Sequence, residues 1–390
     1  MTRPLAYDDI AAAGYTTRNS GLRSVVGPGG RLPSAQSGSN RGALSFVEYR
    51  AAVDIARPRI LHLNWRVTTS GGLLETDGDA ELTVTDMIEY NGALSAQVTG
   101  TAAPGAEVIN DMGPIAIPKG ATFRVWSRRS GPLVLYTSHG VLEPTLPYGY
   151  QVKFAADTST LPLPAATGTT ISAPSNGNMY APYVLDESNV RAVVLLDDSH
   201  GAGQGDTPLL TGARGPYERF YAGRVPLMNL STGGASAASY LTTGNFVRRS
   251  RLLGYATDIC LGVAGNDLSN GRTAAQIVAD LTTIRDTLLP AGIKVFTATE
   301  LPKTNSTDSW ATVANQTVQT SEPERRALNL WKRTSGFFDY WFEFEKVIGV
   351  ASAGDIVWPA GTTTDGIHGN ADSYGRVNLL RDDPFGGTYF

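Results

Sequence analysis

Residues 256–299 read ATDICLGVAGNDLSNGRTAAQIVADLTTIRDTLLPAGIKVFTAT, and this stretch decides the fold class. Its two ends, ATDICLGV and IKVFTAT, are short apolar runs typical of buried parallel strands. Between them four apolar residues recur at helical spacing, which predicts one buried helical face that ends before Pro290. The residues of this face are Ile277, Leu281, Ile284 and Leu288. Strand, helix and strand at this spacing indicate a βαβ unit.

The same pattern continues on both sides of this unit. RAVVLL at 191–196 and RVPLMNL at 224–230 are further strand candidates, and EPERRALNLWKR at 322–333 predicts a second helix with Pro323 in its first turn. The apolar side of that helix would consist of Ala327, Leu330 and Trp331. Residues 185–390 are therefore predicted to form a three-layer, doubly wound parallel α/β sheet, whose ligands bind at the carboxyl ends of the strands.

The first 184 residues have a different pattern. Residues 1–40 are rich in glycine, serine, arginine and threonine without apolar periodicity, which predicts an N-terminal arm. Residues 41–155 contain short β-type segments separated by turn signals, and apolar and polar residues alternate in ELTVT and TFRVW. We expect an all-β sandwich or jelly-roll domain here. Residues 156–184 are predicted to be a linker or connecting segment.

The composition excludes several classes of protein. The chain of 390 residues is 42% hydrophobic and 17% charged, which is too apolar for a disordered protein. A net charge of −4 provides no broad basic surface, so no nucleic-acid partner is expected, and Cys260 as the single cysteine excludes an internal disulfide and a cysteine-built zinc site. We find neither a membrane span nor a signal peptide. The expected location is the cytoplasm, or the cell exterior or a virion reached by a non-Sec route.

Polar stretches follow the predicted strands, at the edge where ligands bind: DDSHGAG (197–203), NLSTGGAS (229–236), GVAGNDL (262–268) and TDGIHGN (364–370). Ser199 directly follows an apolar strand, and a serine hydroxyl becomes a good nucleophile only when a base removes its proton. Of the four histidines, His62 and His139 lie in β-domain segments, and His200 adjoins Ser199 on a turn, where neighbouring side chains point apart. His368 remains as the candidate base.

The remaining groups of an acyl-transfer site are also present. Asp365, three residues before His368, is placed to contact the imidazole Nδ1 while Nε2 faces the serine. Donors for a developing oxyanion would be the backbone amides of Ser199 and Gly234 and the side-chain NH₂ of Asn266. Each of these residues alone is also typical of an ordinary turn, cap or packing position, so the interpretation depends on their joint occurrence.

The four stretches resemble the SGNH hydrolase superfamily, also called GDSL esterases, which is defined by four blocks in fixed order. The matching residues, in chain order, are Asp198 and Ser199, Gly234, Asn266 and Asp267, and Asp365 and His368. Two positions depart from the family pattern, because Asp197 and Ala264 stand where the first and third blocks begin with glycine. The first block reads DSH rather than DSL, which is similar to SGNH domains that act on O-acetyl groups of polysaccharides.

The resemblance implies a serine esterase without metal or organic cofactor. Ser199, His368 and Asp365 would form the catalytic triad, and the amides of Ser199 and Gly234 with the Asn266 side chain would form the oxyanion hole. The expected substrate is a short-chain, acetyl ester, either a small molecule or an acetylated polysaccharide. Two alternatives stay open: a general short-chain carboxylesterase or lipase, and a non-catalytic phage-tail-type or adhesin-like glycan-binding protein. A homo-oligomer is possible.

Overall fold

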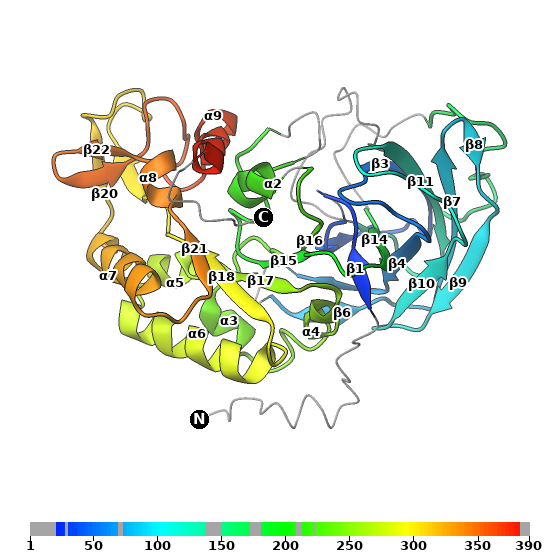
Figure 1. Ribbon diagram of the computed structural model, residues 1–390, viewed down its shortest axis with the longest axis horizontal. Coiled ribbons are helices and arrows are strands. Elements are labelled where there is room, and N and C mark those ends of the chain that lie inside the picture. Colours follow the sequence, from blue (N-terminus) through cyan, green and yellow to red (C-terminus); the bar gives the residue numbers. More distant parts are fainter. Residues whose placement is uncertain are drawn as a thin grey trace.

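The structure, a computed structural model, describes residues 21–27, 30–68, 73–136, 150–171, 181–207, 213–221 and 223–382. His139, one of the four histidines considered above, lies outside these residues. An all-β N-terminal portion packs beside an α/β portion (Figure 1). Within the described ranges no helix is both long and apolar enough to cross a membrane.

Two larger antiparallel sheets and two two-stranded pairs make up the described N-terminal portion. Its strands are β1 (Leu22–Ser24), β2 (Ala35–Gln36), β3 (Gly42–Arg50), β4 (Arg59–Leu63), β5 (Trp65–Val67), β6 (Glu75–Asp77), β7 (Leu82–Tyr90), β8 (Ala93–Leu94), β9 (Val98–Ala102), β10 (Glu107–Asp111), β11 (Thr122–Ser130), β12 (Leu135–Tyr136), β13 (Tyr150–Ala155) and β14 (Tyr183–Glu187). One larger sheet has the order β1-β14-β4-β10, and the other has the order β13-β3-β11-β7-β8, with β9 also paired to β7. The two-stranded pairs are β2 with β12 and β5 with β6.

Residues from both sheets share one apolar core. Ile60 and Val184 of the first sheet pack with Val47 and Val125 of the second, so the sheets face one another as a sandwich. The alternation in ELTVT and TFRVW is confirmed, because Leu82, Val84, Phe123 and Val125 are all buried. Jelly-roll connectivity stays a prediction.

A five-stranded parallel sheet organises the α/β portion. Its elements are β15 (Val193–Leu196), α2 (Gly215–Tyr221), β16 (Leu227–Asn229), α3 (Ala237–Tyr240), α4 (Arg249–Leu252), η1 (Leu253–Tyr255), β17 (Asp258–Leu261), α5 (Gly265–Ser269), α6 (Ala274–Leu288), β18 (Lys294–Ala298), β19 (Thr304–Ser306), β20 (Gln316–Val318), α7 (Glu322–Thr334), β21 (Tyr340–Phe342), α8 (Phe344–Ile348), β22 (Val350–Ser352), β23 (Asp355–Val357), α9 (Ala371–Gly375) and η2 (Arg376–Asp382). The order is β16-β15-β17-β18-β21. Figure 1 shows α3 and α6 on one face of this sheet and α2, α8 and α9 on the other, which makes three layers.

The two long helices bury different kinds of face. The predicted apolar face of α6 is confirmed, because its four residues are buried against the sheet. The predicted face of α7 is wrong at two of its three residues: Leu330 is 60% exposed and Ala327 faces solvent, whereas Trp331 packs half-buried against the core. Beside Leu328 this helix buries Arg325 and Lys332, which pair with carboxylates of Glu345 and Glu300. Apolar periodicity misses the charged part of such a face because these side chains are buried as ion pairs.

The N-terminal segment is built into both portions. Strand β1 pairs with β14, and β14 itself crosses the predicted boundary at residue 185 and lies in the N-terminal sheet. Val26 accepts a hydrogen bond from the amide of Leu227, and Arg31 forms a parallel bridge with Asn229 beside β16. Val26 and Arg31 therefore lie against β16, the edge strand of the parallel sheet. The division into an arm, a β domain, a linker and a catalytic domain stays a prediction.

A buried ion pair joins the two portions. Glu75 of β6 binds Arg249 of α4 at 3.1 Å, and both side chains are completely buried. The Glu75 carboxylate also accepts the backbone amide of Arg249, and the guanidinium stacks over Tyr240. Apolar residues of β4 and β5 share a core with the parallel sheet on the same side. The contact between the two portions is thus as buried as the interior of a single domain.

We expect Arg249→Ala to lower the free energy of unfolding by about 3–5 kcal/mol, because it leaves the buried Glu75 carboxylate with only the longer pair to Arg248 at 3.9 Å. The matched control is Arg41→Ala, whose pair with Asp79 is 46% and 37% exposed and should contribute less than about 1 kcal/mol. Urea unfolding followed by circular dichroism measures both. Equal effects for the two variants would contradict a buried interface.

Candidate active site

Three of the four predicted stretches lie at the carboxyl edge of the parallel sheet. Ser199 follows β15, Gly234 follows β16 and Asn266 lies on α5, directly after β17. Strands β15 and β17 are neighbours, although β16 comes between them in the chain. This is the topological switch point, where doubly wound sheets open a crevice. The fourth stretch, with Asp365 and His368, forms the turn before α9.

A continuous hydrogen-bonded chain joins Ser199, His368 and Asp365. The His368 Nε2 lies 2.8 Å from the Ser199 Oγ, and its Nδ1 lies 2.7 Å from the Asp365 Oδ2. Because a carboxylate only accepts, Nδ1 carries the proton and Nε2 is left to accept the serine hydroxyl. The structure therefore brings these three predicted residues together in the order serine, histidine, aspartate, in which a histidine can accept the serine proton.

Local hydrogen bonds hold the carboxylate of Asp365 in place. Its Oδ1 accepts the backbone amides of Ile367 and His368, both at 2.8 Å. Partial burial opposes ionisation, but the His368 side chain and these amides outweigh it and hold the pKa of Asp365 well below its usual range. The carboxylate is therefore charged at any pH at which the histidine could act as a base.

Two backbone amides at this edge of the sheet have no hydrogen-bond acceptor among the described residues. Gly234 has a positive φ of 83°, and among the described residues no hydrogen bond uses its amide or that of Ser199. The side-chain NH₂ of Asn266 was expected to be available as a donor, but part of it is already hydrogen-bonded. Its Nδ2 donates to the Ala235 carbonyl at 2.8 Å and lies 3.4 Å from the Asp198 carboxylate. One hydrogen is thus committed, and the other makes only a long contact.

Asp267 has a role that sequence reasoning missed. Its carboxylate accepts the amides of Ala237 at 2.6 Å and Ala238 at 3.3 Å, at the start of α3. It also pairs with Arg272 at 3.2 Å. Asp267 therefore ties the segment that follows Gly234 to the segment that carries Asn266. The Asn266-Asp267 pair in the sequence pointed to this residue, but its contact with the start of α3 depends on the fold.

Asp197 is buried, and no ion pair joins it to an arginine of the described ranges. It is 3% exposed, and Cβ atoms built on Gly201 and Gly262 would meet its side chain at 2.5 and 2.6 Å. These two glycines therefore make room for the carboxyl group that stands where the resembling family has glycine. Burial, and then the neighbouring Asp198 carboxylate, raises the pKa of Asp197 to about 8. The group is thus mostly protonated at neutral pH.

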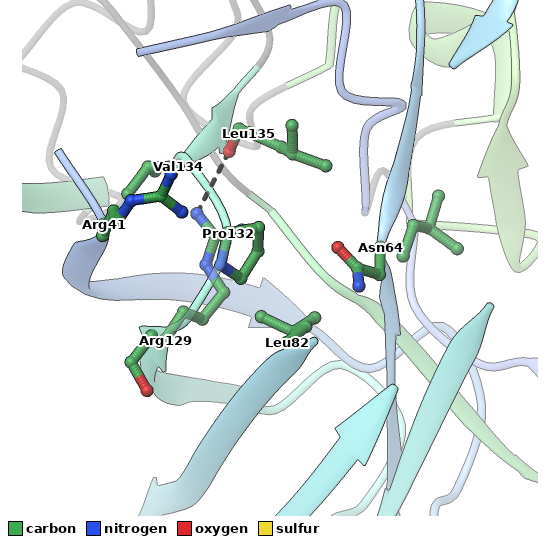
Figure 2. A pocket seen from close by; sticks show the side chains of 9 residues that line it. Arg41, Asn64, Leu82, Arg129, Pro132, Val134 and Leu135 are labelled. Atoms are coloured by element: carbon green, nitrogen blue, oxygen red, sulfur yellow. Dashed lines mark hydrogen bonds between the residues drawn. The ribbon is translucent and has the colours of Figure 1, made fainter. Parts of the chain in front are cut away.

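A pocket in the β portion is too small for a sugar. Figure 2 shows it between Arg41, Asn64, Leu82, Arg129 and Leu135. Its internal volume is about 10 Å³, which is the space for one water molecule. Among the described residues no group of three histidine, cysteine, aspartate or glutamate side chains is placed to hold a metal ion.

The chain matches no protein-family model and no curated protein. Solved structures similar to about half of it include a carbohydrate acetylesterase from Sinorhizobium meliloti, with 15% identity over 49% of this chain and 96% of that one, at a TM-score of 0.33. An aryl esterase from M. smegmatis has 14% identity over 49% and 96%, with a TM-score of 0.33. A GDSL-like lipase from Bacteroides thetaiotaomicron has 12% identity over 49% and 86%, with a TM-score of 0.36.

The raised pKa of Asp197 predicts a pH-dependent stability. The Asp197 carboxyl titrates at about 4 in the unfolded chain and at about 8 in the folded protein. Its contribution to the free energy of unfolding is therefore fully present below about pH 4 and decreases as pH rises from about 4 to about 8. Asp197→Asn keeps a neutral group and should remove the fall, which makes the variant more stable than the wild type at pH 8 and nearly equal to it at pH 4.5. Asp286→Asn, an exposed control, should keep the fall. Urea unfolding at both pH values measures the difference, and parallel curves for Asp197→Asn and the wild type would contradict the assignment.

Proposed function

We propose that this protein is a serine esterase that hydrolyses short-chain acyl esters. The observation that carries the proposal is the hydrogen-bonded chain from Asp365 through His368 to Ser199 at a sheet switch point. Ser199 is 7% exposed, so a substrate would have to reach a nearly buried hydroxyl rather than one on an open surface. Every group in the reaction is a side chain or backbone group of the chain itself.

The first half of the reaction transfers the acyl group to Ser199. Its Oγ attacks the carbonyl carbon while the proton passes to the His368 Nε2, which forms an imidazolium. The charged Asp365 stabilises this imidazolium through Nδ1–H. The tetrahedral intermediate then collapses, the alkoxide leaves with the proton returned by His368, and an acyl-serine ester remains. Water, deprotonated by the same nitrogen, hydrolyses that ester and restores the hydroxyl.

The oxyanion would bind the amides of Ser199 and Gly234 and the side chain of Asn266. The two amides have no competing acceptor among the described residues. Asn266 is oriented by its bond to Ala235, and its second hydrogen has only the 3.4 Å contact with Asp198 to give up. Such preorganised donors stabilise charge that develops in the transition state.

The substrate proposal rests on the residues that make up the segment after β16. Residues 233–239 read GGASAAS, which supplies no long apolar wall for a fatty chain. Acetyl and other short acyl groups therefore suit the site better than long ones. For the alcohol we propose a carbohydrate, free or in an acetylated polysaccharide, because the serine block reads DSH as in the SGNH domains that act on O-acetyl groups. The β portion would then form one side of the polymer site.

Ser199→Ala should abolish hydrolysis of p-nitrophenyl acetate and leave the melting temperature nearly unchanged, because only a hydroxyl group is lost. Ser250→Ala is the matched control, since its hydroxyl only caps the Val247 carbonyl near α4. Initial rates and thermal unfolding of both purified variants test the proposal. Retention of most activity by Ser199→Ala would reject it, and a wild type that binds glycans without any turnover would favour the non-catalytic alternative.

The small side chains of residues 233–239 predict that kcat/KM falls with acyl length. The measurement is kcat/KM for acetate, butyrate and octanoate p-nitrophenyl esters, with the Ser199→Ala rate subtracted as background. A second arm measures acetate release from an acetylated polysaccharide. Faster turnover of octanoate than of acetate would move the function to the lipase alternative, and no release from the polysaccharide would leave a general short-chain carboxylesterase.

A further inference from the structure

His200 lies between two hydrogen-bond acceptors that belong to different loops. Its Nδ1 is 3.1 Å from the Oδ1 of Asp198, on the serine loop, and its Nε2 is 2.9 Å from the carbonyl oxygen of Ile367, on the His368 turn. Neither nitrogen contacts Ser199, which agrees with the expectation that this histidine is not the base. The side chain of His200 is 11% exposed.

The two acceptors determine the protonation state of the ring. A carboxylate and a carbonyl only accept, whereas a neutral imidazole has one donor nitrogen and one acceptor nitrogen. Both contacts are therefore satisfied only when His200 is an imidazolium. A neutral ring would turn one lone pair toward an acceptor and lose that bond.

Ile367 connects His200 to the base. Its carbonyl is held by His200, its amide is held by the Asp365 carboxylate at 2.8 Å, and the next residue is His368. The His200 and His368 rings lie 5.4 Å apart between their centroids. The His200 contact is therefore the link from the loop that carries the nucleophile to the turn that carries the base.

We propose that His200, as an imidazolium, is a positioning residue that holds the turn of Asp365 and His368 against the loop of Ser199, and that its deprotonation releases this turn. The inference rests on the proposed esterase function. It assigns His200 no contact with substrate. When His200 loses its charge, the relative positions of Ser199, His368 and Asp365 are expected to change, although all three residues are still present.

The charges around His200 give the direction of the effect. Burial lowers the pKa of its ring, but the Asp198 carboxylate and its hydrogen bond outweigh this and raise the pKa to about 9. Asp197 adds a second carboxyl on the same loop, while His368 and Tyr374 face the ring from the last turn and α9. Both contacts are thus present together below about pH 9, and one of them is lost as pH rises through this value.

The test is the pH profile of kcat for p-nitrophenyl acetate, with Ser199→Ala rates subtracted. The wild type should lose activity on an alkaline limb near pH 9. His200→Gln has no titrating group, so this limb should disappear, and kcat at pH 7.5 should fall by about 10- to 100-fold with KM changed less than about twofold, as expected for a displaced base. Asp197→Asn is the control, because its own titration would otherwise explain an alkaline limb. It should keep the limb, moved to lower pH because a carboxylate that raises the pKa of His200 is removed.

An unchanged limb in His200→Gln, or its loss in Asp197→Asn alone, would overturn the inference. The absence of any Ser199-dependent turnover in the wild type would instead reject the proposed function. A second measurement needs no substitution at residue 200: NMR titration of the imidazole signals in Ser199→Ala. A His200 ring that titrates near pH 9 supports the proposal, and one that is neutral at pH 7 overturns it.

Discussion

The candidate site depends on one constraint, which is that Ser199 and His368, 169 residues apart in the chain, must keep Oγ and Nε2 at 2.8 Å. The serine side of this contact is set by the sheet, because β15 is an inner strand with all four residues buried. The histidine side has no strand beneath it. Its turn is held by polar contacts from several elements, so its position reflects the whole α/β portion rather than local sequence.

Gly366, between Asp365 and His368, shows how closely that turn is packed. Its carbonyl accepts the Trp358 indole and the Thr304 amide, both at 2.9 Å. It has a φ of +73°, and a Cβ there would lie 2.0 Å from the Thr304 carbonyl oxygen and 2.7 Å from Trp310. Glycine is required by both the conformation and the space. Thr304 of β19 thus helps to hold the turn that carries the base.

Apolar pattern predicted the parts of the fold in which hydrocarbon is buried. The face of α6, four of the five strands of the parallel sheet and the buried apolar positions of β7 and β11 were predicted, because burial of apolar side chains follows the period of the element. The edge strand β21 was not predicted. The pattern failed where charge is buried. Helix α7 covers the sheet with Arg325 and Lys332, and the β portion is joined to α4 by Glu75 and Arg249. A charged residue looks exposed in a sequence until its partner is found elsewhere in the chain.

The sequence by itself determined the order of the βαβ elements and the residues that follow the strands, including Ser199, since both depend on short-range spacing, and elimination among the histidines singled out His368. Only the tertiary structure decided what surrounds those residues. It placed Asp197 in the interior and His200 between Asp198 and Ile367, and it placed Val26 and Arg31 against the edge strand β16. These features are contacts between segments far apart in the chain, and the hydrogen bonds and desolvation that define them exist only after the segments have packed together.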